Sequence, residues 1–289
     1  MELHVLMPHP TSLGMGYVFT AEDGRLLVID GGLDDMGSHR KEGFLFSELQ
    51  RISGKACPEI AGWIFTHAHS DHFSEFCRMC EEHPGEFSVR RFFFHFMTDG
   101  FAEKVMSSKD ISRFRWFHSC FDRFYSDRMA YERYPKVKVG DVFELPGIRV
   151  EFLRVPNENI LANAINNTSI VFRLTAQGQT YLFLGDLGIE GGNELVARYG
   201  DALACDVCQM AHHGQKGCDG NVYAAASPKI CLFPAAIWNL ENWGPGDRPG
   251  EGNSMIGQTL AFPGVAGAEH LFACKTGTTC YPLPLEVRP

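Results

Sequence analysis

The chain has 289 residues, of which 45% are hydrophobic, and a formal net charge of −9 at pH 7. This length can bury a large core without disulfides, whereas the acidic total lowers the expectation of a nucleic-acid partner, which usually requires a basic surface. Residues 1–8 lack the basic and then apolar run of a signal peptide, and no apolar stretch is long enough to span a bilayer. We therefore expect a cytoplasmic protein without a membrane partner, and ten cysteines fit that reducing compartment.

The first third of the chain alternates short apolar segments with turns, which predicts strands. The predicted strands are residues 3–7, 17–20, 25–29, 60–65 and 89–96. A helix is predicted over residues 39–52, because apolar residues recur there at helical spacing and Gly54 follows. A second helix is predicted to begin near Asp71 or His72 and to end near Glu82.

Aromatic residues at helical spacing fill residues 101–131, which predicts one or two helices inserted between sheet elements, at about residues 98–135. Further strands are predicted at residues 136–139, 142–145, 148–155, 169–174, 181–184, 206–210 and 229–233, and helices at residues 190–199 and 222–226. Two rounds of strands, each followed by helices, predict an α/β (α+β) fold of four layers, αββα. No linker divides the chain, so we expect one domain over residues 1–289 that carries the helical insertion.

Two CxxC pairs occur, Cys77/Cys80 and Cys205/Cys208. A shared four-cysteine zinc site is one interpretation. Both pairs lie inside predicted regular elements rather than on turns, so we expect small buried apolar residues instead. A turn-rich segment at residues 242–250 is interpreted as a surface loop, with a place beside an active site as the alternative.

Three histidines and an aspartate, His67, His69, Asp71 and His72, fall within six residues directly after a predicted strand. In an extended turn His67 and His69 point the same way, because side chains alternate with period two, whereas Asp71 and His72 stand where a helix begins. One segment can therefore serve two metal ions, the two histidines one ion and the Asp/His pair the other. Imidazole and carboxylate ligands suit zinc, and also manganese or iron. A chance cluster on a polar turn is the less favoured alternative.

This segment, His-Ala-His-Ser-Asp-His, matches the HxHxDH motif of the metallo-β-lactamase superfamily, and the chain resembles that family over most of its length. Residues 29–32 resemble its early strand-Asp-Gly motif, in which Asp30 would support the metal-binding loop. Residues 183–186 resemble the strand-Gly-Asp motif, whose carboxylate, here Asp186, would bridge both metals. Residues 211–214 resemble the late histidine motif that completes the second site, with His212 slightly preferred over His213 as the ligand. The resemblance implies a metallo-β-lactamase-like sandwich with two divalent metal ions.

One departure from the family pattern lies at residues 163–171. Many members carry a histidine there as a third protein ligand of the first metal, but this sequence has Asn166 and Asn167. The Asn-Asn-x-Ser pattern, with the later His-His-Gly, resembles a branch that includes the hydrolase-like domain of bacterial competence DNA-uptake proteins and the phosphocholine esterases. The resemblance implies phosphoester chemistry, with Asn166 or Asn167 near the first metal or its water. His95 and His118 are interpreted as core or surface histidines rather than replacement ligands.

A hydroxide held between two metal ions is a nucleophile at neutral pH. We therefore expect a metal-dependent hydrolase acting on a small, anionic phosphoester. Asp71 would bind metal and orient the hydroxide. One of His212 and His213 would bind the second metal, and the other would contact the leaving group or the phosphate. Two alternatives remain open: an acyl hydrolase (lactonase, thioesterase or β-lactamase-like) on the same site, and a metal-binding module without turnover.

Overall fold

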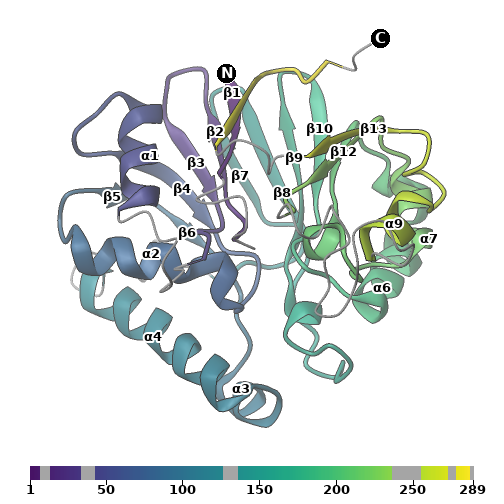
Figure 1. Cartoon of the computed structure of the whole chain (residues 1–289), viewed down its shortest axis with the longest axis horizontal. Coiled ribbons are helices and arrows are strands. Elements are labelled where there is room, and N and C mark those ends of the chain that lie inside the picture. Colours follow the sequence, from purple (N-terminus) through teal and green to yellow (C-terminus); the bar gives the residue numbers. More distant parts are fainter. Residues whose placement is uncertain (7–13, 34–42, 126–135, 236–254, 273–277, 287–289) are drawn as a thin grey trace, which may run out of the picture.

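The computed structural model describes residues 1–6, 14–33, 43–125, 136–235, 255–272 and 278–286. Within these ranges, two seven-stranded sheets face each other and helices cover their outer faces (Figure 1). This arrangement confirms the expected α/β fold with four αββα layers. The turn-rich segment 242–250 lies outside the described residues.

The first sheet contains the strands of the chain's beginning and one strand from its end. Its order is β14-β1-β2-β3-β4-β5, and β6 also pairs with β4. These strands are β1 (Glu2–Val5), β2 (Tyr17–Thr20), β3 (Leu26–Ile29), β4 (Glu59–Ile64), β5 (Ser88–Val89), β6 (Phe92–Phe93) and β14 (Thr279–Pro282). Because β3 and β4 run parallel, both deliver their following residues to the same edge of the sheet. The segment predicted as one strand over residues 89–96 forms two short strands instead, and β14 was not predicted.

The second sheet has the order β13-β12-β11-β10-β9-β8-β7. Its strands are β7 (Val142–Leu145), β8 (Ile148–Arg154), β9 (Val171–Ala176), β10 (Gln179–Phe183), β11 (Val207–Gln209), β12 (Ile230–Phe233) and β13 (Glu269–Phe272). Strands β10 to β13 run parallel, so the turns after β10 and β11 also share one edge. The strand predicted at residues 136–139 contributes only an isolated bridge between Lys136 and Phe94.

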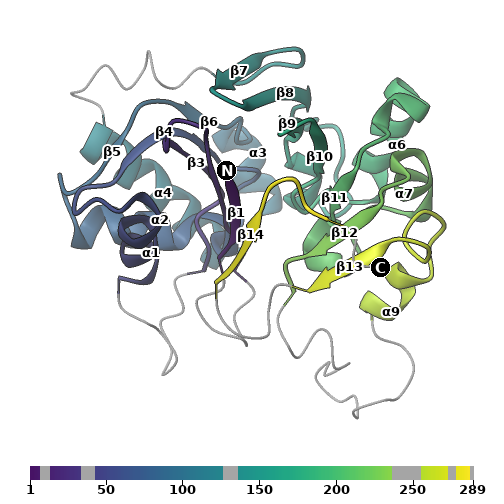
Figure 2. The same cartoon turned by 90° about the horizontal axis from the view of Figure 1, so that it is seen from above.

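The helices form the two outer layers (Figures 1 and 2). The first sheet is covered by α1 (Phe44–Ser53), α2 (Ser70–Glu82), α3 (Asp99–Val105) and α4 (Ser108–Tyr125), and α6 (Ile189–Tyr199), α7 (Gly220–Ala226) and α9 (Met255–Leu260) accompany the second. The predicted insertion corresponds to α3 and α4, and its last residues, 126–135, are not described. Among the described residues, no helix has both the length and the apolar character needed to cross a bilayer.

Apolar side chains fill the space between the sheets and beneath each helical layer. The β3 strand shows how: Leu27 and Ile29 belong to the cluster between the sheets, while Leu26 and Val28 belong to the cluster under α1, α2 and α4. A strand buried on both faces reads as a continuous apolar run, which is why it is easily predicted. The aromatic stripe of α4 is core as well, since the Phe117 ring lies 5.1 Å from that of Phe65.

The two CxxC pairs belong to different layers. Cys77 and Cys80 are buried in the cluster beneath α2, and Cys205 and Cys208 are buried in the cluster beneath α6 and α7. Because both sheets separate these clusters, the pairs cannot share one metal ion. The four-cysteine zinc interpretation is therefore wrong, and the expectation of small buried apolar residues is confirmed.

Candidate metal centre

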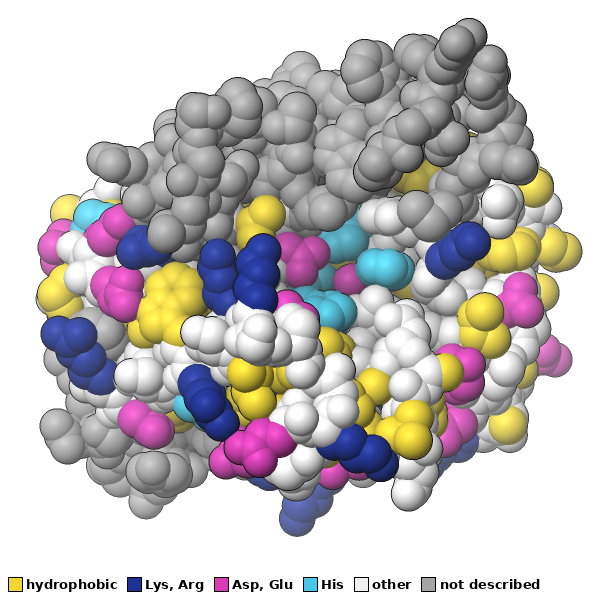
Figure 3. Space-filling view, turned by 60° about the horizontal axis from the view of Figure 1, so that its bottom comes forward, with side chains coloured by type: hydrophobic (Ala, Val, Ile, Leu, Met, Phe, Trp, Pro, Cys, Tyr) yellow, Lys and Arg dark blue, Asp and Glu magenta, His cyan; other side chains and the backbone are white. Residues whose placement is uncertain are grey.

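The predicted ligands meet where the corresponding edges of the two sheets approach each other. The segment after β4 carries His67 to His72, and the turns after β10 and β11 carry Asp186 and His213. The backbone N–H of Ile170 donates to the carbonyl of Thr66 (2.9 Å), which ties the two sheets together at this edge. Histidine and acidic side chains gather there in a hollow of the surface (Figure 3).

Two groups of side chains at this edge of the sheets have the geometry of metal ligands. The ligand atoms of His67, His69 and Asp186 lie within 4.8 Å of one another, and so do those of a second group formed by Asp71, His72, Asp186 and His213. Asp186 belongs to both groups. Its Oδ1 lies 3.3 Å from Nε2 of His72, and its Oδ2 lies 3.8 Å from Nε2 of His67. A carboxylate in this position can bridge two cations.

The lack of hydrogen-bond partners among the ligand atoms is consistent with metal binding. Nε2 of His72 and Oδ1 of Asp186 are buried and have no hydrogen-bond partner, although they face each other. Nε2 of His67 and Nδ1 of His69 converge to 3.0 Å. Leaving buried polar atoms unpaired costs about 1–3 kcal/mol each, and a cation between the nitrogens and the carboxylate would satisfy them. The donor set of imidazole nitrogens and carboxylate oxygens is typical of zinc and also suits manganese or iron.

Burial and charge set the protonation of the centre. Burial lowers the pKa of His67 well below its usual value and also lowers the pKa of His69, which leaves both imidazoles neutral at pH 7. Burial opposes ionisation of Asp186, but His72 and His213 outweigh it and hold the pKa of that carboxyl group well below its usual range. Burial likewise opposes the charge on His72, but Asp186 and Asp30 outweigh it and raise its pKa well above the usual value. Cations would take the place of that proton, because a ligating histidine must be neutral.

Asp30 holds this histidine ring in place. It ends β3 with a left-handed backbone (φ 55°), and its Oδ2 lies 2.8 Å from Nδ1 of His72. The same carboxylate accepts hydrogen bonds from the backbone N–H (2.7 Å) and the hydroxyl (2.9 Å) of Thr66. With Nδ1 directed at Asp30, the Nε2 lone pair of His72 faces Asp186.

The two predicted asparagines lie in different surroundings. Asn166 lies beside His212: its Nδ2 is 3.4 Å from Nε2 of that histidine, and its Oδ1 is buried without a hydrogen-bond partner. Asn167 turns away, and its Oδ1 accepts from the backbone N–H groups of Gly188 (3.1 Å) and Gly191 (3.0 Å) at the start of α6. Of the two, only Asn166 contacts the late histidine pair, through His212, which lies 3.9 Å from Asp186.

His212 and His213 also differ in burial and in their contacts. His213 is buried, its Nε2 lies 3.1 Å from Oδ2 of Asp71, and its Nδ1 lies 2.9 Å from the carbonyl of Pro234. Both rings lie at similar distances from Oδ2 of Asp186 (3.9 Å and 3.8 Å), but the His212 side chain is 30% exposed and belongs to neither ligand group. The geometry thus favours His213 as a ligand rather than our preferred His212. Both residues have left-handed backbones (φ 52° and 58°), so the chain turns sharply and brings the second ring inward.

Sequence reasoning missed side chains that hold the turn carrying Asp186. Gln209 accepts from the backbone N–H groups of Leu184 (2.9 Å) and Gly185 (2.8 Å) and donates to the Gly185 carbonyl (3.1 Å). The Ser169 hydroxyl accepts from the N–H of Asp186 (3.1 Å). A glutamine in an apolar strand was the available signal, because a buried polar side chain must find partners.

Two histidines considered as replacement ligands belong to the packing, as interpreted. Nδ1 of His95 lies 2.9 Å from the carbonyl of Val137. The His118 ring packs against Phe114, with 4.6 Å between ring centroids. Neither belongs to a ligand group formed by the described residues.

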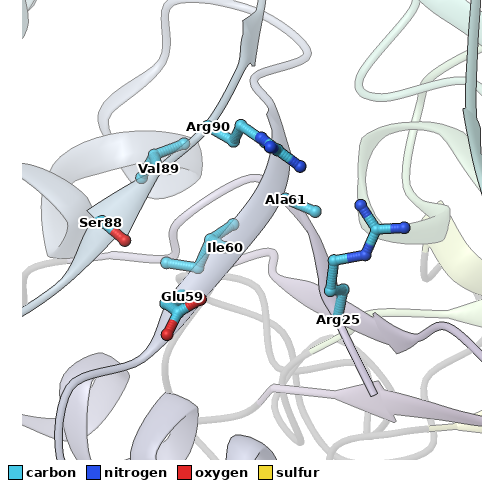
Figure 4. Close-up of a pocket in the computed structure, with 7 residues that line it drawn as sticks. All are labelled: Arg25, Glu59, Ile60, Ala61, Ser88, Val89 and Arg90. Carbon is cyan, nitrogen blue, oxygen red and sulfur yellow. The ribbon is translucent and has the colours of Figure 1, made fainter. Parts of the chain in front are cut away.

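A separate hollow of about 290 Å³ lies at the opposite end of β4 (Figure 4). Arg25, Glu59 and Arg90 are among its lining residues, and Arg25 is already paired with Asp23 at 2.7 Å. Because Glu59 begins β4 whereas the histidine segment follows its end, this hollow is not part of the metal centre.

Residues 13–217 match the family model of the metallo-β-lactamase superfamily. The chain belongs to this superfamily. The match includes the histidine segment, Asp186 and the late histidine pair, and it confirms the family resemblance of the motifs. Members of the superfamily are mostly metal-dependent hydrolases, and the ligand groups described above are consistent with a divalent metal site.

Two curated relatives are competence proteins that are longer than this chain. ComE operon protein 3 of Bacillus subtilis (strain 168) is 25% identical over 220 residues, which are 73% of this chain and 25% of that protein. Competence protein ComA of Neisseria gonorrhoeae is 34% identical over 94 residues, which are 32% of this chain and 13% of that protein. The chain therefore spans about a quarter or less of these relatives. Their similarity supports the expected likeness to the competence branch.

Solved structures share the superfamily fold at low sequence identity. The metallo-β-lactamase fold protein YhfI of Bacillus subtilis has a TM-score of 0.52 at 12% identity and covers 97% of this chain and 99% of its own. CmlA, a diiron β-hydroxylase of Streptomyces venezuelae, has a TM-score of 0.54 at 13% identity and covers 98% of this chain and 54% of its own. These likenesses concern the fold alone.

Proposed function

We propose that this chain is a metal-dependent hydrolase of small, anionic phosphoesters. The observation that carries the proposal is the position of Asp186, which is common to two ligand groups and has one buried oxygen without a hydrogen-bond partner. When bound, two divalent ions would supply a hydroxide nucleophile at neutral pH and neutralise the oxygens of a phosphate group. Zinc is the preferred metal in this proposal, with manganese or iron as alternatives.

Each ligand group has a part in this proposal. His67, His69 and Asp186 would hold the first ion, and Asn166 would serve as a weaker ligand or as a hydrogen-bond partner of a water. Asp71, His72, His213 and Asp186 would hold the second ion. Asp71 would also orient the attacking hydroxide. Its carboxylate is 22% exposed, whereas the other members of the group are buried.

His212 is proposed to meet the substrate. Its side chain is more exposed than that of His213 and lies beside Asn166. A ring at the rim of a metal centre can donate a hydrogen bond to a phosphate oxygen or to the leaving group. His213 would then serve as a ligand and His212 as a catalytic group.

Phosphoester hydrolysis is favoured over acyl hydrolysis by one local feature. Residues 163–171 offer Asn166 rather than a histidine to the first ion, the pattern that resembles the competence and phosphocholine esterase branch. The similarity to competence protein ComA agrees with this branch. We therefore expect turnover of phosphodiesters or phosphomonoesters rather than of lactams.

The test combines metal analysis with a substrate panel. The purified chain, loaded in turn with zinc, manganese and iron, is assayed on aryl phosphodiesters, phosphomonoesters, lactones and thioesters. We expect two ions per centre, phosphoester turnover and its loss in Asp186→Asn, while the control His95→Gln keeps both metal and activity. Turnover of lactones or thioesters alone would replace phosphoester with acyl chemistry. Tight metal binding without any turnover would make the chain a binding module.

A further inference from the structure

A second cluster of metal-ligand side chains lies on the pairing of the first and last strands. Strand β1 is hydrogen-bonded to β14, and His4 stands directly opposite Cys280 in that register. Glu2 precedes His4 by two residues, so its side chain is on the same face of the sheet. Figure 2 shows β14 beside β1 near the labelled N-terminus.

This cluster is separate from the metal centre around Asp186. Strand β1 is antiparallel to β2, and β2 is antiparallel to β3, so β1 and β3 point the same way. Glu2 begins β1, whereas Asp30 follows the end of β3, and the two therefore lie at opposite edges of the sheet. Glu2, His4 and Cys280 share no residue with the ligand groups of the other edge.

The interatomic distances suit a tetrahedral ion. Oε2 of Glu2 lies 3.1 Å from Nε2 of His4, and Sγ of Cys280 lies 4.0 Å from the same nitrogen. Zinc bonds of about 2.0–2.1 Å to nitrogen and oxygen and about 2.3 Å to sulfur separate such ligands by about 3.4 Å and about 3.6 Å. Both observed distances are therefore within about 0.5 Å of those of a bound ion, a difference that side-chain rotation removes.

The direction of the contacts argues against a nucleophilic cysteine. In a Cys-His-carboxylate relay, the thiol and the carboxylate bind opposite nitrogens of the ring. Here Glu2 and Cys280 both face Nε2 of His4, while Nδ1 is buried without a hydrogen-bond partner among the described residues. Three donors that converge on one point are the arrangement of ligands around an ion.

We propose that Glu2, His4 and Cys280 bind a thiophilic divalent cation, zinc or cadmium by chemical class, with water as the fourth ligand. A carboxylate and a thiolate together balance its two charges. The nearby Arg51 does not oppose binding strongly, because Glu48 pairs with its guanidinium at 2.7 Å. His4 is only 3% exposed, whereas Glu2 and Cys280 are exposed, so an ion can reach the buried imidazole from the surface. The bound ion would fasten β14 to β1.

Cobalt is the probe that distinguishes this site from the hydrolytic centre. A cobalt–thiolate bond gives a charge-transfer absorption band in the near ultraviolet, and no cysteine belongs to the ligand groups that contain Asp186. Titration of the full chain with Co²⁺ should produce this band. The band should be lost in Cys280→Ser, shifted to higher cobalt concentration in Glu2→Gln, and retained in Cys57→Ser, which removes another exposed cysteine.

Alkylation gives a second readout that does not require absorbance or activity. Zinc should protect Cys280 from a maleimide while Cys57 in the same molecule continues to react. Phosphoester turnover should be unchanged in Cys280→Ser, so this proposal and the hydrolase proposal fail independently. The inference is overturned if the folded chain binds cobalt without a thiolate band, if the band persists in Cys280→Ser, or if zinc leaves Cys280 fully reactive.

Discussion

Nδ1 of His72 lies 2.8 Å from Oδ2 of Asp30, a buried contact between residues 42 positions apart. Both side chains are fully enclosed, and the same carboxylate also binds the backbone and the hydroxyl of Thr66. The contact fixes the ring so that Nε2 faces Asp186. The orientation of a ligand in one motif thus depends on a residue from another.

Asp30→Asn should weaken metal binding without removing any ligand. An amide cannot accept from Nδ1 and from Thr66 as the carboxylate does, so His72 loses its fixed orientation. Loss of such a supporting partner typically costs about 10–100-fold in metal affinity. Competition with a chromophoric chelator measures the change. Asp23→Asn, the same substitution in a surface turn, is the control, and equal affinities of the two variants would contradict the role of Asp30.

Asn166→Ala and Asn167→Ala should have different effects, although the residues are neighbours. Loss of Asn167 removes the acceptor of two backbone N–H groups at the start of α6, so the free energy of unfolding should fall by about 2 kcal/mol. Loss of Asn166 should reduce occupancy of the first ion and leave stability nearly unchanged. Its Oδ1 has no hydrogen-bond partner to lose, and its Nδ2 has only a long contact of 3.4 Å with His212. Denaturant unfolding of the metal-free variants, with metal analysis in parallel, separates the two effects. An unstable Asn166→Ala variant would count against this division.

Gln209→Leu should destabilise the chain and disturb the centre together. The substitution leaves buried N–H and C=O groups of the turn before Asp186 without partners, which costs about 3 kcal/mol. The same loss frees Asp186 to move, so metal affinity should fall as well. Gln50→Leu removes one exposed hydrogen bond of the same side-chain type and should stay within about 0.5 kcal/mol of the parent. A stable Gln209→Leu variant with full metal affinity would refute the positioning role.

Acid should abolish the stabilising effect of Asp206. Burial opposes its ionisation, but Lys229 and Thr180 outweigh burial and lower the pKa of the carboxyl group from its usual 3.8. A group with a lowered folded-state pKa stabilises the fold above its unfolded pKa and loses that effect as pH falls through the folded pKa. The parent should therefore be more stable than Asp206→Asn at pH 6, and the difference should shrink as pH falls below 3.8. Denaturant unfolding in the presence of EDTA measures both free energies of unfolding without a contribution from metal. A difference between the parent and Asp206→Asn that grows in acid would contradict this prediction.

Metal removal should lower the melting temperature and abolish turnover. An ion that binds only the folded chain stabilises it by about 2.7 kcal/mol at a concentration one hundred times its Kd. The experiment is best done in Cys280→Ser, so that only the Asp186 centre responds. EDTA should lower the melting temperature, and added zinc should restore both temperature and activity. Unchanged melting with full loss of activity would mean that the ions bind the unfolded chain equally well.

Much of the site could be predicted because its ligands follow strands. Buried strands such as β3 and β4 are continuous apolar runs, and Asp30 and His67 stand directly after them. The sequence could not show which of His212 and His213 is the ligand. That depends on two consecutive residues with left-handed backbones, which no sequence pattern predicts. The roles of Asn166 and Asn167 could not be predicted either, because they depend on the hydrogen bonds of Asn167 to the start of α6. Strand β14 was missed because it pairs with β1, which is remote in sequence.

In the proposed two-ion centre, Asp186 carries a single negative charge and belongs to both ligand groups. The first cation to bind would partly neutralise this carboxylate. The second cation would therefore bind a weaker ligand and would be repelled by the first cation. The two ions should consequently bind with unequal affinities. The weaker affinity should belong to the first-ion site, which Asn166 would complete. Metal supply could then set the proportion of half-filled and filled molecules, and hence the amount of working catalyst.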